Sequence, residues 1–156
     1  MKNQELTRQL QVLQSLFKKT SIATNSDIEM QAHWAKYLCV LSAGFLENAL
    51  TQIYISFCRN AASEPVANYT SLSLTKIQNP KCTKFVELAA SFKKEWGDEL
   101  EKFVSDGGRK EALDSIVANR HLIAHGKDSG ITLSRLQEYL NKSIQVIDFI
   151  EKQCSR

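Results

Sequence analysis

An arginine and two histidines lie close together in the segment Asn119-Arg120-His121-Leu122-Ile123-Ala124-His125-Gly126. An arginine cannot lose its charge, and its guanidinium presents a fixed fork of donors that fits phosphate oxygens. Histidine side chains give and take protons near neutral pH, because their unperturbed pKa is about 6.5. Together these residue types suit chemistry at a phosphate, in which one group binds the charge and another moves a proton.

The spacing of the apolar residues around Arg120 predicts a helix whose apolar stripe includes Ile116 and Ile123. Arg120 lies on this stripe, so it must meet an internal acid, a bound anion or a water-filled cleft. His125 comes at or just after the last turn and shares a face with Arg120 only if the chain turns there, which Gly126 permits. The structural alternative for His125 is a cation that stabilises a helix C-terminus.

His121 and His125 also have the i, i+4 spacing of a metal-chelating pair. A zincin helix carries Glu directly after the first His, and this chain has Leu122 there. No third ligand is evident, so no metal site is predicted. The four cysteines, at positions 39, 58, 82 and 154, form no CxxC pair and are interpreted as buried free thiols rather than a disulfide scaffold.

Glu47 is the one formal charge between Tyr37 and Cys58. This stretch is long enough to raise the question of a membrane span, but it contains Asn48 and Gln52, and the rest of the chain is polar. We therefore expect a central helix wrapped by other helices, and no membrane. Two interpretations of Glu47 remain open: a structural ion pair or edge position, and a place beside a working cation such as Arg120.

The chain has 156 residues, of which 43% are hydrophobic, and a formal net charge of +3. That length and composition predict a single domain, 1–156, with a real core. The mild positive charge neither requires nor excludes an anionic partner. The first residues lack the apolar region of a signal peptide, so we expect a protein of the reducing cytoplasm.

Scarce Gly and Pro and long stretches of helical period predict an all-α chain. Ser26 opens a capping box, and Asn79-Pro80 has the form of an N-cap followed by Pro. The segment 59–80 has no clear amphipathic period and is expected to be a long connection. The resulting prediction is an up-and-down bundle of about five helices. The helices are expected over 4–19, 26–59, 80–93 and 95–104 (one broken helix or two short ones), 109–124 and 133–153.

The octapeptide around Arg120 resembles the HEPN superfamily (higher eukaryotes and prokaryotes nucleotide-binding domain). Arg120 and His125, separated by four residues, match its Arg-x(4–6)-His motif, and His121 supplies the polar residue that typically follows the Arg. The helix order is similar too, with an acidic residue in a long second helix and the motif near the end of the penultimate one. The chain most resembles the RiboL-PSP-associated branch of this superfamily, over its whole length.

This resemblance implies a metal-independent endoribonuclease of a toxin–antitoxin or anti-phage system, acting without a cofactor. Arg120 and His125 would be its catalytic pair, supported by His121, Asn119 and Glu47. HEPN proteins usually form homodimers in which two motifs build one composite cleft. The ribose 2′-OH would attack the phosphate and leave a 2′,3′-cyclic phosphate and a 5′-hydroxyl. An antitoxin protein is a further expected partner.

The residues that would hold the RNA are less defined. Lys127 and Arg109, which flank the motif helix, are the best candidates for binding its backbone, and Tyr69 could stack a base. Trp34 and Trp96 are expected in the core or at an interface. Two alternatives stay open: a HEPN module without catalytic activity that binds a nucleotide or a partner protein, and a purely structural bundle with an internal Arg120–Glu47 ion pair.

Overall fold

The computed structural model describes Met1 and residues 3–155, and all regular secondary structure in this part of the chain is helical. The predicted all-α class is therefore confirmed, but the predicted number of about five helices is wrong. The helices are α1 (Gln4–Ala23), α2 (Ile28–Ala61), α3 (Glu64–Leu74), α4 (Cys82–Phe92), α5 (Lys94–Val104), α6 (Arg109–Ala124) and α7 (Leu133–Gln153).

The long helix α2 is the centre of the fold and packs against α1, α3, α6 and α7. Its length and apolar composition would suffice to span a membrane, but 67% of its most apolar window is buried inside the protein. This burial fits the predicted central helix. Asp27, not Ser26, caps its N-terminus, because the Asp27 carboxylate accepts a hydrogen bond from the backbone N–H of Met30.

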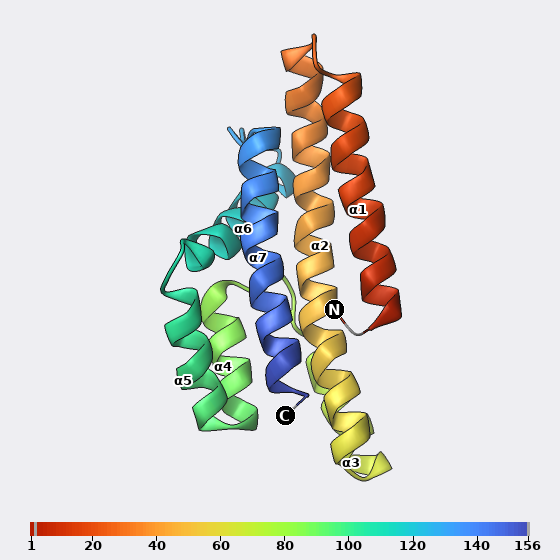
Figure 1. Cartoon of the computed structure of the whole chain (residues 1–156), viewed down its shortest axis with the longest axis vertical. Coiled ribbons are helices and arrows are strands. Elements are labelled where there is room, and N and C mark those ends of the chain that lie inside the picture. Colours follow the sequence, from red (N-terminus) through yellow and green to blue (C-terminus); the bar gives the residue numbers. More distant parts are fainter. Residues whose placement is uncertain (2, 156) are drawn as a thin grey trace.

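The helices α1 and α2 run antiparallel as a long hairpin whose tip extends beyond the neighbouring ends of α6 and α7 (Figure 1). The helices α4 and α5 form a second, shorter hairpin beside the C-terminal half of α7, and α3 lies at the end of the molecule opposite the α1–α2 tip. Fully buried side chains of α7 fill the space between these units, among them Leu136, Ile147 and Ile150. The last helix has the predicted bounds.

Two helices, α3 and α4, differ from the prediction. In both, contacts with other parts of the fold determine where the helix forms. In α3 only Ala67 and Leu74 are buried, so the helix shows no apolar stripe, and the expected connection over 59–80 is wrong. The predicted helix start at Asn79-Pro80 is also wrong, because α4 begins at Cys82. The backbone N–H of Cys82 donates to the carboxylate of Asp114 in α6, a partner distant in sequence.

Candidate functional site

The C-terminal end of α6 places the predicted motif at the surface. His125 is the C-cap residue, and Gly126 follows it with a φ of 64°. The N–H of Gly126 donates to the carbonyl of Ile123 (3.1 Å), and the N–H of Lys127 donates to that of Leu122 (2.9 Å). This pair of bonds is a Schellman motif, which ends the helix in a defined conformation. The predicted stop at Gly126 is confirmed.

Both histidines of the motif are exposed and lie against one another at this helix end. The ring centroids of His121 and His125 are 4.4 Å apart, with the ring planes tilted by 57°. The i, i+4 spacing and the C-cap position of His125 bring the rings together. Two imidazoles thus lie side by side at the surface.

Arg120, which directly precedes His121 in sequence, is half-buried. Among the residues that the structure describes, its guanidinium makes no hydrogen bond and no ion pair. The helix α6 crosses α2 where the Cys39 thiol lies 3.6 Å from the Ile116 carbonyl oxygen, one turn before Arg120. A half-buried guanidinium without an internal acid is suited to receive an anion from outside.

Glu47 does not accompany Arg120. Its carboxylate accepts a hydrogen bond from the backbone N–H of Asn79, which has a positive φ of 46°. Glu47 lies about 12 Å further along α2 than the crossing at Cys39, at 1.5 Å per residue. The carboxylate therefore holds the turn before α4, and of the two interpretations left open for Glu47, the pairing with Arg120 is absent from the described part of the chain.

Asn119 makes two hydrogen bonds within the fold. Its amide donates to the Ser115 carbonyl (2.8 Å), and its side-chain oxygen accepts a hydrogen bond from the hydroxyl of Ser129 (2.8 Å). Ser129 is only 5% exposed, so this bond ties the loop after His125 to α6. Asn119 is thus a positioning residue with both polar ends engaged. Ser129 was not predicted, because nothing in its sequence neighbourhood distinguishes it from an ordinary loop serine.

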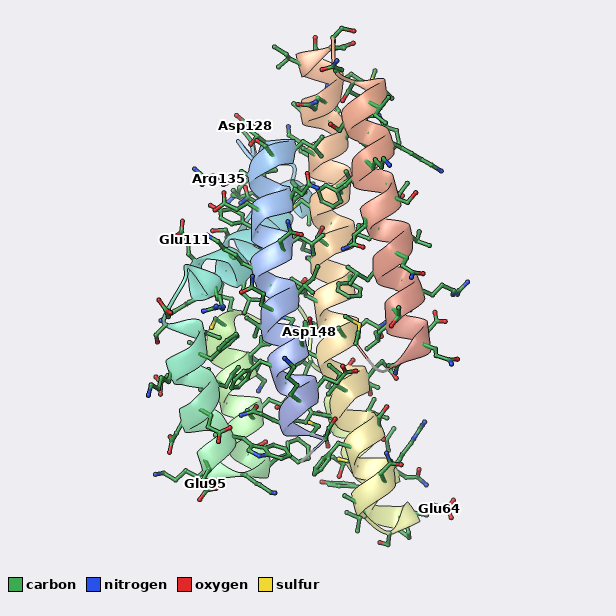
Figure 2. The ribbon with its side chains drawn as sticks, viewed as in Figure 1. Glu64, Glu95, Glu111, Asp128, Arg135 and Asp148 are labelled. Carbon is green, nitrogen blue, oxygen red and sulfur yellow. The ribbon has the colours of Figure 1, made fainter. Side chains whose placement is uncertain are left out.

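Two lysines lie near the loop after the motif. Lys127 is exposed in that loop, and its binding of RNA phosphates stays a prediction. The Lys36 ammonium of α2 is 3.8 Å from the carboxylate of Asp128. Figure 2 shows Asp128 projecting where α6 ends and α7 begins, at the opposite end of the molecule from Glu64 on α3. Lys36 was not predicted as part of the site, because it belongs to a different helix.

Arg109 lies apart from the motif. It starts α6, so about 16 Å of helix separate it from Arg120. Its guanidinium donates to the side chain of Gln145 (2.9 Å) and to the carbonyls of Phe103 (3.2 Å) and Asp106 (3.0 Å). It also covers the Phe103 ring at 4.1 Å. These contacts give Arg109 a structural role, and the structure does not bring it together with Lys127.

Other reactive groups of the described chain lie outside this site. No group of three His, Cys, Asp or Glu side chains that could hold a metal ion is found in the part of the chain that the structure describes. All four cysteines are free thiols; three are buried and Cys154 is half-buried. Burial raises the pKa of Cys39 and of Cys154 to about 12 and that of Cys82 to about 11. Such thiols are poor nucleophiles near neutral pH.

Comparison with protein families found one match, and it covers nearly the whole chain. The family described as RiboL-PSP-HEPN matches residues 3–156. No curated protein and no solved structure matches the chain.

Proposed function

The chain belongs to the RiboL-PSP-HEPN family, and from this premise we propose that it is a metal-independent endoribonuclease in which Arg120 and His125 are the catalytic pair. The observation that carries the proposal is the half-buried guanidinium of Arg120, which has no ion pair among the described residues and lies next in sequence to the exposed pair of His121 and His125. A cation without an internal partner, beside two proton carriers, is the arrangement that phosphate chemistry requires.

The proposed reaction uses the nucleophile that RNA itself carries. A histidine takes the proton of the ribose 2′-OH, the 2′-oxygen attacks phosphorus, and the bond from phosphorus to the 5′-oxygen breaks. A second histidine gives a proton to the departing 5′-oxygen. Arg120 stabilises the charge that develops on the other phosphate oxygens. The products are a 2′,3′-cyclic phosphate and a 5′-hydroxyl.

We propose that the second histidine comes from a second copy of the chain. An apolar groove of about 550 Å³ lies between α1 and α2, and Val12, Leu16, Val40, Leu41 and Gly44 are among the residues that line it. Val12 in this groove is 56% exposed in the single chain. An exposed apolar groove is typical of a surface that a partner covers. We propose that the two-fold axis of this dimer passes through the groove, which includes Val40 of α2.

The test is cleavage of RNA by the purified protein. Arg120→Ala and His125→Ala should each lower the rate by about 100-fold or more, whereas Arg59→Ala, an exposed arginine in the last turn of α2, should cleave as the wild type does. EDTA should leave the rate unchanged. Unchanged cleavage by both motif variants, or loss of cleavage with EDTA, would overturn the proposal. Nucleotide binding without cleavage would instead favour the module without catalytic activity.

The biological setting is proposed on family membership alone. We propose a cytoplasmic toxin of a toxin–antitoxin or anti-phage system, whose cleavage of RNA is restrained by an antitoxin protein. Expression of the wild-type chain in a bacterial host should then arrest growth, and expression of His125→Ala to the same level should not. Equal growth in the two cultures, with cleavage confirmed in vitro, would remove the toxin role and leave the nuclease.

A further inference from the structure

A lysine of α2 reaches the loop that follows the motif. The Nζ atom of Lys36 lies 3.8 Å from Oδ1 of Asp128. Only 34% of the Lys36 side chain is exposed, whereas the Asp128 side chain is 99% exposed. Figure 2 shows Asp128 where α6 ends and α7 begins. This contact therefore brings a half-buried cation from a second helix to the C-terminal end of α6.

Lys36 lies on the side of α2 that faces α6. It precedes Cys39 by three residues, so the two side chains are neighbours on one helix face. The Cys39 thiol is 3.6 Å from the carbonyl oxygen of Ile116, and this contact shows where the two helices meet. Arg120, which is half-buried, follows Ile116 by four residues and is its neighbour on α6.

The two helices run from this meeting point toward the motif, because Lys36 contacts the loop after α6. Lys36 lies about 4.5 Å along α2 from Cys39, at 1.5 Å per residue. Arg120 lies about 6 Å along α6 from Ile116, in the same direction. The two cations are therefore at about the same height along the pair of helices.

The contact between Lys36 and Asp128 is of a kind that another anion can replace. An ion pair with a fully exposed partner contributes little to stability, because water screens it and both side chains lose freedom. A lysine ammonium binds phosphate as a compact point charge. Since Lys36 is half-buried, salt screens its charge less than that of a fully exposed lysine. Lys36 is thus suited to exchange the Asp128 carboxylate for a phosphate.

We propose that Lys36 is a second phosphate-binding residue of the nuclease site, and that Asp128 occupies it as an internal competitor until RNA binds. This inference rests on the proposed function and adds the way in which the substrate is held. Arg120 acts on the phosphate that reacts, and Lys36 holds a neighbouring phosphate of the same strand. Lys36 is thus a positioning residue, and Asp128 lowers the affinity of the site for RNA.

The first test measures binding without cleavage. A single-stranded 2′-O-methyl oligonucleotide lacks the nucleophilic hydroxyl, and its fluorescence anisotropy gives the affinity at several salt concentrations. Lys36→Ala should weaken binding and reduce the slope of log affinity against log salt by about 0.7, the value for one phosphate contact on a single strand. Lys36→Arg keeps the charge and should retain the slope. An unchanged slope in Lys36→Ala would overturn the proposal.

Asp128→Ala should have the opposite effect on the same probe. It frees Lys36, so binding should tighten by up to about fivefold, the fold-change that corresponds to an exposed ion pair. In the Lys36→Ala background, Asp128→Ala should give no such gain. Weaker binding by Asp128→Ala would mean that the ion pair only maintains the loop. An equal gain in both backgrounds would mean that Asp128 repels RNA directly, and either result would overturn the competition.

The matched control is another exposed ion pair. Lys94 and Asp98 of α5 lie 3.6 Å apart, measured from Nζ to Oδ2. Figure 2 shows Glu95, the neighbour of Lys94 in sequence, far from Asp128. Lys94→Ala and Asp98→Ala should therefore change neither the affinity nor the slope. Effects equal to those of Lys36→Ala and Asp128→Ala would show that net charge alone decides binding, and would overturn the proposal.

Cleavage kinetics separate this inference from the proposed function. Lys36→Ala should raise KM more than it lowers kcat, because Lys36 does not touch the reacting phosphate. Loss of cleavage in Arg120→Ala, with Lys36→Ala binding the probe as the wild type does, would remove only the role of Lys36. Unchanged cleavage in Arg120→Ala would remove the proposed catalytic pair. Opposite shifts in affinity for Lys36→Ala and Asp128→Ala would even then support the competition for Lys36.

Discussion

The side-chain oxygen of Asn119 accepts a 2.8 Å hydrogen bond from the hydroxyl of Ser129, on the far side of the loop that follows His125. The amide of the same asparagine donates to the Ser115 carbonyl, so the side chain is held at both ends. The loop that follows His125 is thereby held against α6. A residue that the family resemblance suggested as a support of the motif acts here through the position of the backbone.

Replacement of Asn119 by Ala should lower the free energy of unfolding by about 1–3 kcal/mol, because it leaves the buried hydroxyl of Ser129 without its partner. Urea denaturation measures this change. A double-mutant cycle with Ser129→Ala should give a coupling energy of about 1 kcal/mol between the two residues. A coupling of zero would mean that the bond contributes nothing to stability.

Replacement of Gly126 by Ala should cost about 1 kcal/mol of stability, because the glycine has a φ of 64° that a side chain rarely adopts. A Cβ there meets no atom within 4 Å, so the cost comes from the backbone alone. Gly130 is the matched control, since it is equally open and has no positive φ. Gly130→Ala should leave the thermal midpoint unchanged or raise it slightly. Equal effects of the two substitutions would contradict the helix-end geometry.

Replacement of Arg120 by Ala should cost less than about 1 kcal/mol of stability, because the guanidinium has no ion pair among the described residues. Loss of one partner of a buried ion pair typically costs about 3–5 kcal/mol. Thermal or urea denaturation distinguishes these values, and the cleavage assay on the same sample gives the activity. A large loss of stability would favour the purely structural bundle over the nuclease.

Replacement of Gly44 by Arg should disrupt the proposed dimer without disturbing the fold of one chain. A Cβ at Gly44 meets no atom of the chain within 4 Å, so the new side chain extends into the groove between α1 and α2. Analytical ultracentrifugation should show a monomer with unchanged helical content and weakened cleavage. Gln14→Arg, on the exposed outer side of α1, should leave the dimer intact. A dimer that survives Gly44→Arg would exclude this groove as the interface.

Stability should fall as the pH rises from about 9 toward 12, because burial raises the pKa of the Cys39 thiol from 9.0 to about 12. Above pH 9 the unfolded chain releases this proton and the folded chain does not, so the unfolded state is favoured. Other groups titrate in this range as well. The measurement is therefore the thermal midpoint of the wild type and of Cys39→Ala as a function of pH. The midpoint of Cys39→Ala should fall less steeply with pH than that of the wild type.

The parts of the fold that local chemistry decides could be predicted from the sequence. Helix α6 ends at Gly126 because of its backbone freedom, and α7 begins after Thr132, whose side chain accepts from the N–H of Arg135. The start of α4 could not be predicted, because the Asp114 carboxylate from α6 satisfies its first N–H. Helix α3 shows no amphipathic signal, since it packs on one neighbour and leaves Tyr69 in solvent.

The candidate site was predictable only along one helix. The i, i+4 spacing of His121 and His125 is a local property, and the structure brings these two rings together at the end of α6. Contacts between elements distant in sequence could not be predicted. Glu47 accepts from the backbone N–H of Asn79, and Arg109 donates to Gln145 of α7. Trp34, which is 40% exposed, was expected in the core or at an interface, because composition alone does not tell an exposed ring from a buried one.

The Schellman end of α6 also limits how the proposed site would attract phosphate. Anion sites in proteins commonly use a helix N-terminus, where free N–H groups and the positive end of the macrodipole face the ligand. Here the motif lies at the carbonyl end, whose partial negative charge repels a phosphate. All of the attraction must then come from a few side-chain cations, with Arg120 foremost. Binding at the proposed site should therefore weaken as salt is added, because the Debye length is only about 8 Å at physiological ionic strength.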